Sequence, residues 1–421
     1  MKKIDTLISD SLWEKLIVGF LIAWIVLPAI CIIMLSMNFA FHPLMVKLTP
    51  YWGYILLILS FWVFVKRKAK IDLKQNLPYC FLIAMLVWIF ISAIFSTNKE
   101  IAFWGYEFRK EGALAFLGYT GFFCGMLALS KEKYRKIVFD TFLWVAVFQS
   151  IVSFLNYIGL DILTMGYVDG DTLYRAAWKW TGAYHNPNHF GYYLTMAIMY
   201  AGYTFVLNKK SCIYLISYII LAITLVFNNT LGCFIAVVIT LILGSIFLYI
   251  KDKKTLKKNI VLIALLIVIT TMITITANEG IISSLIQTGN EIGDIAQGEI
   301  DGDAGSGRME LWLGALQFIG ERPLVGYGPD NLYEYYKKIG VDNGKTHNEY
   351  LQYMAECGIP TLIFYLSAIG IIFVRRIKNI KKLSNAQVTF MGVCGAYLIS
   401  AFFGCTMVYT MPYFWMALAI V

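Results

Sequence analysis

The strongest constraint in this sequence is a succession of apolar runs, most of them long enough to cross a lipid bilayer. A membrane-spanning helix needs about 20 mostly apolar residues to cover roughly 30 Å of hydrocarbon. Of the 421 residues, 59% are hydrophobic and 14% are charged, whereas soluble domains carry about 25% charged residues. The sequence therefore predicts an all-α polytopic membrane protein with about 12 transmembrane helices. The runs lie near 15–37, 51–65, 79–96, 113–130, 137–159, 190–207, 212–228, 231–250, 260–277, 349–374, 387–408 and 413–421.

The first and last runs differ from the others. The run 15–37 has no small-residue cleavage site, so we expect a retained span rather than a signal peptide. The run 413–421 is too short to cross the bilayer, so either the chain ends early or this segment is a half-helix. The eight cysteines lie in apolar runs without a CxxC pair, and we interpret them as small core residues.

Basic residues are distributed unevenly between alternate loops. With the N-terminus placed in the cytoplasm, the cytoplasmic segments hold 24 of the 35 lysines and arginines. Because cytoplasmic loops of membrane proteins are enriched in these residues, the partition predicts the orientation of the chain. The basic segments are the N-terminal residues up to Lys15, 66–74, 131–136, 209–210, 251–258 and 375–382.

Three segments on the opposite, extracytoplasmic side are long enough to carry a site: 97–112, 160–189 and 278–348. The last is the longest, and loops of more than about 15 residues are usually functional or disordered. We therefore divide the chain into three parts. These are 1–277 with nine transmembrane helices, 278–348 as a large outer loop with amphipathic helices, and 349–421 with the remaining transmembrane helices.

The long loop and the apolar run after it hold the most informative side chains. Arg308 and Trp312 lie on a stretch with helical periodicity. His347 stands where the loop enters a span, and Asn348 is suited to capping that helix. Glu356 lies inside an apolar run, directly before a helix-breaking Gly-x-Pro, and an ionisable group there is costly and usually functional.

Each of these side chains also has a plainer interpretation. Arg308 can be an interfacial arginine whose head group reaches toward water. His347 can be a histidine with a structural hydrogen bond, and Glu356 can be a charge paired with a neighbouring helix for packing. The residues alone leave these alternatives open.

The two shorter outer segments add arginines and aromatic rings. Arg109 lies in WGYEFRKEG before the fourth span, and Arg175 and Asn188 lie in the segment before the sixth. His185 and His189 are four residues apart, a spacing that suits metal ligands on a helix. However, a proline lies between them and no Glu or Cys completes a set, so we expect no metal.

Arginines beside aromatic rings suit one class of ligand in particular. Arginine binds phosphate through two parallel hydrogen bonds, and flat aromatic rings are common partners of sugar faces. A sugar on a lipid diphosphate presents both groups at the bilayer surface. No ATP-binding loop, dinucleotide-binding fingerprint or nucleic-acid-binding motif is present. Any donor on the outer face must therefore arrive already activated, and we expect no cofactor.

Two strings resemble the O-antigen ligase/polymerase superfamily, which includes lipid A-core ligases and Wzy-type polysaccharide polymerases. They are GRMELWLGALQFIGERPLVGYGPDN and THNEYLQYMAECGIPT. The family pattern H-[NSQ]-x9-G-x-x-[GTY] is met by His347, Asn348, Gly358 and Thr361. The pattern R-x3-L is met by Arg308 but not at position 312, where Trp replaces Leu. This difference weakens the choice between ligase and polymerase rather than the family resemblance.

The resemblance implies a fold of the GT-C glycosyltransferase type in the bacterial cytoplasmic (inner) membrane, with the active site on the extracytoplasmic face. It implies transfer of a glycan from undecaprenyl diphosphate to a hydroxyl acceptor. Arginines can neutralise the diphosphate in place of a metal, and displacement with a single base implies inversion at the anomeric carbon. In this scheme Arg308, Arg109 and Arg175 neutralise the diphosphate, and His347 is the general base. Asn348, Glu356, Asn188 and Trp312 complete the expected substrate-binding set. The expected partners are this donor, a glycan, lipid or protein acceptor, and the bilayer, but no nucleic acid.

Several alternatives remain open at this point. Within the enzyme class, a polymerase, a ligase and a protein O-oligosaccharyltransferase differ in the acceptor, which the sequence does not identify. From another class, a polysaccharide or small-molecule transporter also fits about 12 spans. Transporters of that size usually have short loops and repeated halves, whereas this chain has strongly unequal loops and no evident repeat.

Overall fold

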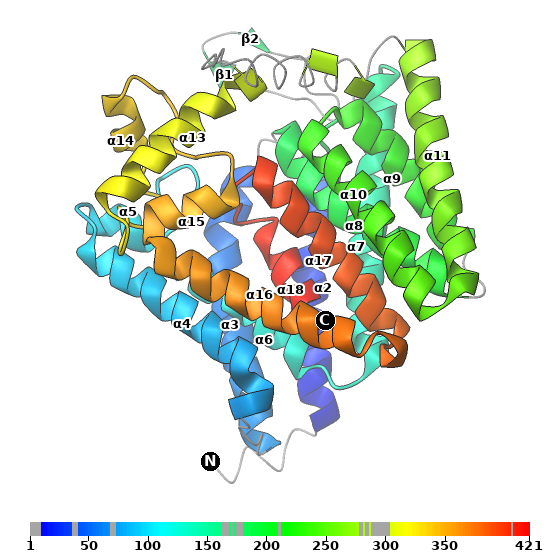
Figure 1. Ribbon diagram of the computed structural model, residues 1–421, viewed down its shortest axis with the longest axis horizontal. Coiled ribbons are helices and arrows are strands. Elements are labelled where there is room, and N and C mark those ends of the chain that lie inside the picture. Colours follow the sequence, from blue (N-terminus) through cyan, green and yellow to red (C-terminus); the bar gives the residue numbers. More distant parts are fainter. Residues whose placement is uncertain are drawn as a thin grey trace.

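The computed structural model is a bundle of helices with a small outer layer of loops and short helices (Figure 1). It describes residues 10–35, 41–67, 73–160, 168–169, 172–173, 180–184, 186–208, 212–277, 281–282, 286–287, 304–405 and 407–421. The sheet structure in this part of the chain is one antiparallel pair of two-residue strands, β1 (Val168–Asp169) and β2 (Thr172–Leu173). The predicted all-α class is therefore confirmed.

Among the described residues, nine helices are long and apolar enough to cross a membrane, and two shorter apolar helices accompany them. The long ones are α2 (Asp10–Leu35), α3 (Phe41–Lys66), α4 (Leu73–Phe95), α7 (Glu132–Tyr157), α8 (Pro187–Leu207), α10 (Leu231–Lys251), α11 (Lys253–Ala277), α16 (Ile359–Lys378) and α17 (Asn385–Ser400). The shorter ones are α6 (Ala113–Ala128) and α9 (Cys212–Asn228). Large apolar side chains such as Ile58, Ile83 and Ile275 are exposed on the outside of this bundle, as expected for helices surrounded by lipid.

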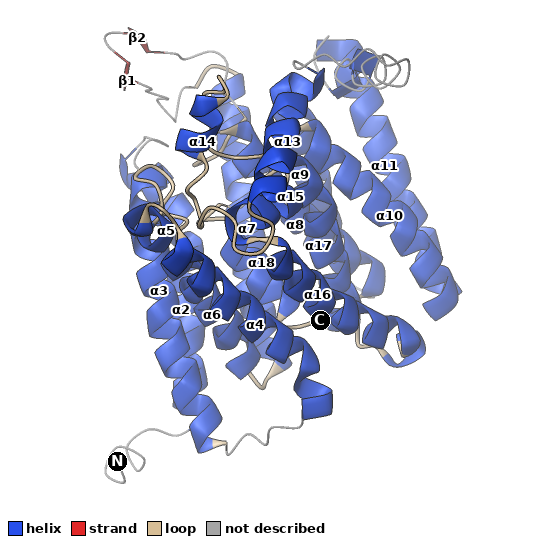
Figure 2. Ribbon diagram, turned by 60° about the vertical axis from the view of Figure 1, so that its left-hand side comes forward, coloured by secondary structure: helices blue, strands red, loops and turns tan. Residues whose placement is uncertain are grey.

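The loops that the charge pattern assigns to the cytoplasm meet at one end of the bundle. Hydrogen bonds join them: Arg67 donates to the Ala128 carbonyl (2.7 Å), Arg375 to the Gln75 carbonyl (2.7 Å) and Lys251 to the Leu383 carbonyl (2.6 Å). Two shorter helices of the outer layer, α13 (Ala304–Glu321) and α14 (Tyr333–Lys338), lie at the opposite end (Figure 2). The structure thus agrees with the predicted grouping of the loops on two sides.

Close helix packing brings α6 against α3, and the beginning of α6 lies below the outer loops. A Cβ atom added at Gly53 would lie 2.1 Å from the Gly118 carbonyl oxygen, and one at Gly121 would lie 1.8 Å from the Gly53 carbonyl oxygen. Small residues allow two backbones to approach this closely in membrane helix pairs. These glycines therefore fix where the loop before α6 is held.

The apolar run predicted as one span over 349–374 is two helices. α15 (Glu349–Cys357) ends at Gly358, and α16 starts directly after it. Gly358 has φ +84°, and a Cβ atom there would lie 1.9 Å from the Leu324 carbonyl oxygen. Glycine adopts this backbone conformation without steric cost. The break at Gly358 is therefore confirmed, and α15 belongs to the outer layer rather than to the membrane-spanning helix.

The outer layer has a small apolar core of its own and is anchored to α4. Its buried side chains are Leu311, Ala315, Phe318, Tyr327, Leu332, Tyr336, Val341 and Ala355. From α4, Trp88 donates to the Leu324 carbonyl (2.9 Å), Ser92 to the Val325 carbonyl (2.6 Å) and Ser96 to the Tyr327 carbonyl (2.8 Å). These bonds hold the 324–327 backbone on the outer end of α4.

The last helix, α18 (Met411–Leu418), is only eight residues long and fully buried inside the bundle. It packs against α6 and α17, so it is a half-helix by length rather than a membrane-crossing one. The short α5 (Lys99–Trp104) and the 3-10 turn η3 (Ala401–Phe403) complete the elements near the outer end. Short buried helices of this kind place irregular backbone inside the membrane part of a protein, where surrounding helices cover it.

The arrangement predicts which positions are accessible from each side of the membrane. A cysteine introduced at the exposed Lys337 should react with an impermeant maleimide on intact cells, whereas one at the exposed Lys381 should react only after lysis. Cys80 and Cys212, which are also exposed, are replaced by serine in both variants. Reaction at Lys381→Cys but not at Lys337→Cys on intact cells would invert the orientation.

Candidate functional site

Four segments of the outer layer converge on a cluster of buried charges. They are the loop 105–112 before α6, the turn 328–332, the loop 341–348 and α15. The side chains of Arg109, Glu111, Asp330, Lys345 and Glu356 meet there, and we call this group the ion cluster. Charged side chains are almost never fully buried unless they are paired, so the pairing inside the cluster determines how these segments are arranged.

Asp330 is the centre of the ion cluster. Its carboxylate is fully buried and accepts hydrogen bonds from the backbone N–H groups of Tyr106 (2.8 Å) and Glu111 (3.2 Å) and from Arg109 Nε (3.0 Å). Burial by itself raises the pKa of this carboxyl, but the charges of Lys345 and Arg109 outweigh it, so the pKa is lowered. The ionised Asp330 therefore closes the 105–112 loop onto the 328–332 turn.

Lys345 connects the cluster to the loop that precedes α15. Its ammonium Nζ lies 3.0 Å from Glu111 Oε2, 3.3 Å from Asp330 Oδ1 and 3.7 Å from Glu356 Oε1. Only 3% of the side chain is exposed. Burial lowers the pKa of Lys345, but the carboxylates of Asp330, Glu356 and Glu111 reverse this effect, so the pKa is raised and the side chain stays charged.

Glu356 ionises less readily than a solvent-exposed glutamate does. Burial raises its pKa to about 7, although Lys345 lowers it. Gln352 donates a hydrogen bond to Glu356 and accepts one from the Thr346 N–H (2.7 Å). α15 is therefore tied both to the ion cluster and to the 341–348 loop.

The backbone around the cluster is held in an uncommon conformation at several residues. Four non-glycine residues of the described chain have a positive φ, and three of them are Lys110 (54°), Asp330 (55°) and His347 (50°). Such residues cost of order 1–3 kcal/mol each and tend to gather at functional sites. Lys110 and Asp330 lie in the segments that the cluster joins, and His347 is two residues from Lys345.

His347 faces positive charges from three segments. Burial, together with the charges of Arg308, Arg109 and Lys345, lowers the pKa of its imidazole to about 4. The ring is half-buried, and its Nε2 lies 3.5 Å from Asn343 Nδ2. At neutral pH the imidazole is therefore uncharged and able to accept a proton.

Arg308 differs from the other two cations because no carboxylate neutralises it within the described part of the chain. It lies on α13, is half-buried, and its charge reaches both His347 and Tyr192 of α8. Trp312, one turn further along α13, packs edge-on against Phe402 with the ring centroids 5.5 Å apart. An unpaired, half-buried guanidinium is a favourable place for an anion.

Asn348 caps α15, as its position in the sequence predicts. Its side-chain oxygen accepts hydrogen bonds from the backbone N–H groups of Tyr350 (3.0 Å) and Leu351 (3.1 Å). The neighbouring Glu349 is fully buried and accepts from Tyr397 (2.7 Å) and Tyr365 (3.2 Å). Burial raises the pKa of Glu349 to about 7. Both residues fix the first turn of the helix that follows His347.

The other predicted site residues are placed less clearly. Asn188 lies in the first turn of α8, where the Asn186 side chain accepts a hydrogen bond from its backbone N–H (2.8 Å). Arg175 lies outside the described residues, as does His185. Arg109 is largely occupied by Asp330, although its buried Nη2 has no hydrogen-bond partner among the described residues. Its predicted role as a phosphate ligand is therefore limited to the part of the guanidinium that Asp330 leaves unbonded.

Sequence reasoning noted Glu111 among the residues before the fourth span but assigned no role in the site to Glu111, Asp330 or Lys345. Each lies in a loop next to glycine, proline or asparagine, where a charged residue is normally solvated. Glu111 lies two residues from Arg109 and Lys345 lies two residues from His347, whereas Asp330 is near none of the residues that the sequence singled out. Nothing in the local pattern shows that the three side chains are buried together.

Comparison with known proteins gives one finding about the family. A family model described as O-antigen ligase matches residues 216–366 of this chain. No curated protein matches the chain. The matched range contains Arg308, Trp312, His347, Asn348 and Glu356. The predicted donor contacts near the first two outer segments lie before it.

The structure predicts that Asp330 is essential for stability. Asp330→Ala leaves Arg109 and Lys345 buried without their shared partner, and breaking a buried ion pair costs about 3–5 kcal/mol. We expect a loss of this size in the free energy of unfolding in detergent. Asp342→Ala is the matched control, because Asp342 is exposed and, among the described residues, binds only the Tyr333 hydroxyl in an exposed contact. Equal stability of the two variants would contradict the prediction.

Proposed function

Residues 216–366 identify this chain as a member of the O-antigen ligase/polymerase superfamily, and from that premise we propose a specific reaction. The protein is a membrane glycosyltransferase that moves a glycan from a lipid diphosphate, of the undecaprenyl type, to a hydroxyl acceptor. It works in the bacterial cytoplasmic membrane, with its site on the extracytoplasmic face. The acceptor distinguishes a polymerase, a ligase and a protein O-oligosaccharyltransferase.

One observation carries this proposal: an unpaired guanidinium and an uncharged imidazole act on the same site. Arg308 has no carboxylate partner in the described chain, and its charge acts on His347. A cation without a counter-ion suits the diphosphate of a donor. An imidazole that stays neutral suits the removal of a proton from an acceptor hydroxyl. The two side chains therefore supply the two functions that glycan transfer from a diphosphate requires.

The reaction balances with these groups alone. The acceptor oxygen attacks the anomeric carbon, and its proton passes to the His347 imidazole. The bond between the anomeric carbon and the diphosphate oxygen breaks, and its electron pair leaves with the lipid diphosphate. Arg308, with the guanidinium of Arg109, stabilises the charge that develops on that oxygen. A single displacement of this kind inverts the anomeric centre.

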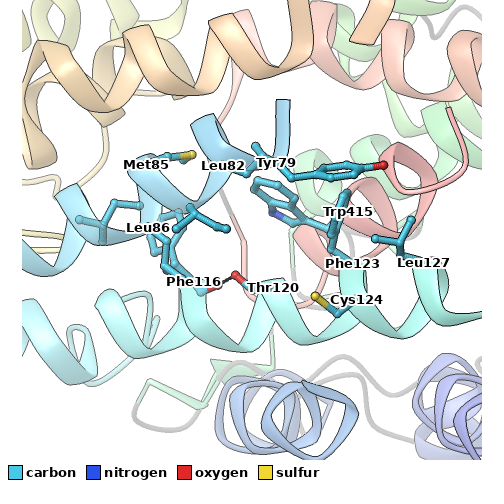
Figure 3. Close-up of a pocket in the computed structure, with 12 residues that line it drawn as sticks. Tyr79, Leu82, Met85, Leu86, Phe116, Thr120, Phe123, Cys124, Leu127 and Trp415 are labelled. Atoms are coloured by element: carbon cyan, nitrogen blue, oxygen red, sulfur yellow. Dashed lines mark hydrogen bonds between the residues drawn. The ribbon is translucent and has the colours of Figure 1, made fainter. Parts of the chain in front are cut away.

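An apolar groove near the ion cluster supports a donor that carries a lipid chain. A cavity of about 170 Å³ lies between α4, α6 and α18, and its lining includes Met85, Ile89, Phe116 and Trp415 (Figure 3). The groove leads toward the cluster along α4, because Ser92, one turn beyond Ile89, donates to the Glu356 carbonyl (3.0 Å). It lies in the membrane-spanning part of the helices, where a polyprenyl chain is located.

The remaining predicted residues have supporting roles in this proposal. Asn348 and Glu356 hold α15 and the loop that presents His347, and Trp312, one turn from Arg308 on the same helix, packs against Phe402. Arg175 and Asn188 stay predicted donor contacts. The transporter alternative has no comparable support, because transport uses neither a proton acceptor nor an activated leaving group at this place.

The general base is tested by the pH dependence of transfer in proteoliposomes with a lipid-diphosphate glycan. His347→Ala should reduce transfer by about 10²- to 10⁴-fold, with donor binding largely intact. Because only the neutral imidazole accepts a proton, kcat/KM should fall as the pH drops through the free-enzyme pKa of about 4, and not near 6.5. A bound diphosphate offsets the cationic charge around His347, so the fall in kcat should lie at higher pH than that in kcat/KM. Transfer by His347→Ala within tenfold of wild type would remove His347 from the chemistry.

The phosphate contact is tested with Arg308 in the same assay. Arg308→Ala should lose donor binding and transfer, and Arg308→Lys should recover only part of both, because an ammonium does not reproduce a planar two-point contact. Arg322→Ala serves as control, since Arg322 instead lies over the Tyr327 ring. Wild-type donor affinity in Arg308→Ala would show that another group binds the diphosphate.

A further inference from the structure

Lys345 is unusual because one buried ammonium serves carboxylates from three other segments. Glu111 precedes α6, Asp330 lies in the 328–332 turn and Glu356 lies near the end of α15. Each Nζ–oxygen separation is 3.7 Å or less. Removing one charge from such a group leaves buried partners uncompensated. The position of the 341–348 backbone is therefore set by the place where this ammonium is held.

The backbone that Lys345 holds is the backbone that presents His347. Lys345 lies two positions before His347, and His347 has a positive φ of 50°. The neighbouring Thr346 is fixed on both sides: its N–H donates to Gln352 (2.7 Å) and its hydroxyl donates to the Asn348 carbonyl (2.7 Å). A residue held in a strained conformation keeps it only when its surroundings determine it.

We propose that Lys345 is the positioning residue for His347, holding the loop that carries the imidazole through its contacts with Glu111, Asp330 and Glu356. This inference rests on the proposed function of the site. Lys345 acts in two ways. It anchors the strained backbone, and its charge adds to the burial and to the charges of Arg308 and Arg109 that keep the imidazole of His347 neutral. Neither action requires Lys345 to touch a substrate, and its ammonium is already occupied by carboxylates.

The first test measures His347 directly and needs no substrate. The chain has four histidines, so ring carbon signals of labelled histidine in detergent micelles are assigned with His347→Gln. In the wild type we expect His347 to stay neutral at pH 5. In Lys345→Met the loss of a nearby positive charge should raise its pKa by about one unit. Lys337→Met, which removes an exposed lysine from the same outer layer, should leave the titration unchanged.

The second test uses transfer from the lipid-diphosphate glycan. Lys345→Met should lower kcat at least tenfold while KM for the donor changes less than about threefold, because orientation of the base is lost and the diphosphate contact is not. The pH at which kcat/KM falls on acidification should rise together with the pKa of His347. Lys345→Arg keeps the charge and should recover part of kcat and the wild-type pH dependence.

Glu111→Gln/Lys345→Met covers the case in which Lys345→Met does not fold, because this double variant removes both charges of one pair and leaves the net charge of the ion cluster unchanged. In this double variant the pKa of His347 should rise as it does in Lys345→Met. An unchanged pKa of His347 in a folded Lys345 variant overturns the inference. A loss of activity that appears only as a higher KM for the donor overturns it as well. A wild type that titrates as expected but transfers no glycan contradicts the proposed function alone.

Discussion

The arrangement of the outer layer depends on one buried interaction, the pairing of Asp330 with Arg109 and Lys345. Asp330 receives two backbone N–H groups and an arginine from the loop before α6, and an ammonium from the loop before α15. Ionised groups leave water at a high cost, which is recovered only when their geometry is well satisfied. The segments that carry the candidate site can therefore be close together only in the arrangement that completes this pairing.

The three cations near His347 thus have different roles. Arg109 and Lys345 are neutralised by carboxylates and hold segments in place, whereas Arg308 is left without a carboxylate partner in the described chain. All three lower the pKa of the imidazole after burial has already lowered it. The cations that prepare the site for an anion therefore also keep the His347 imidazole uncharged until the anion binds.

The membrane helices determine where this outer layer stands. Contacts between Gly53, Gly118 and Gly121 set the position of α6, and serines on α4 hold the 324–327 backbone. The apolar groove lies between the same two helices, α4 and α6, beside α18 (Figure 3). The same two helices therefore support the polar site above and surround the apolar groove below, which brings the two parts of a lipid-linked donor to neighbouring places.

The sequence by itself determined the membrane helices, the grouping of their loops, the break at Gly358 and the cap at Asn348. These features depend on apolar length, basic residues and local backbone chemistry, all of which act over a few neighbouring residues. The tertiary structure alone decided that Glu111, Asp330 and Lys345 are buried together, that Arg109 is paired while Arg308 is not, and that His347 stays neutral far below its usual pKa. Burial and charge pairing depend on which distant segments meet, and no local pattern of residues encodes that.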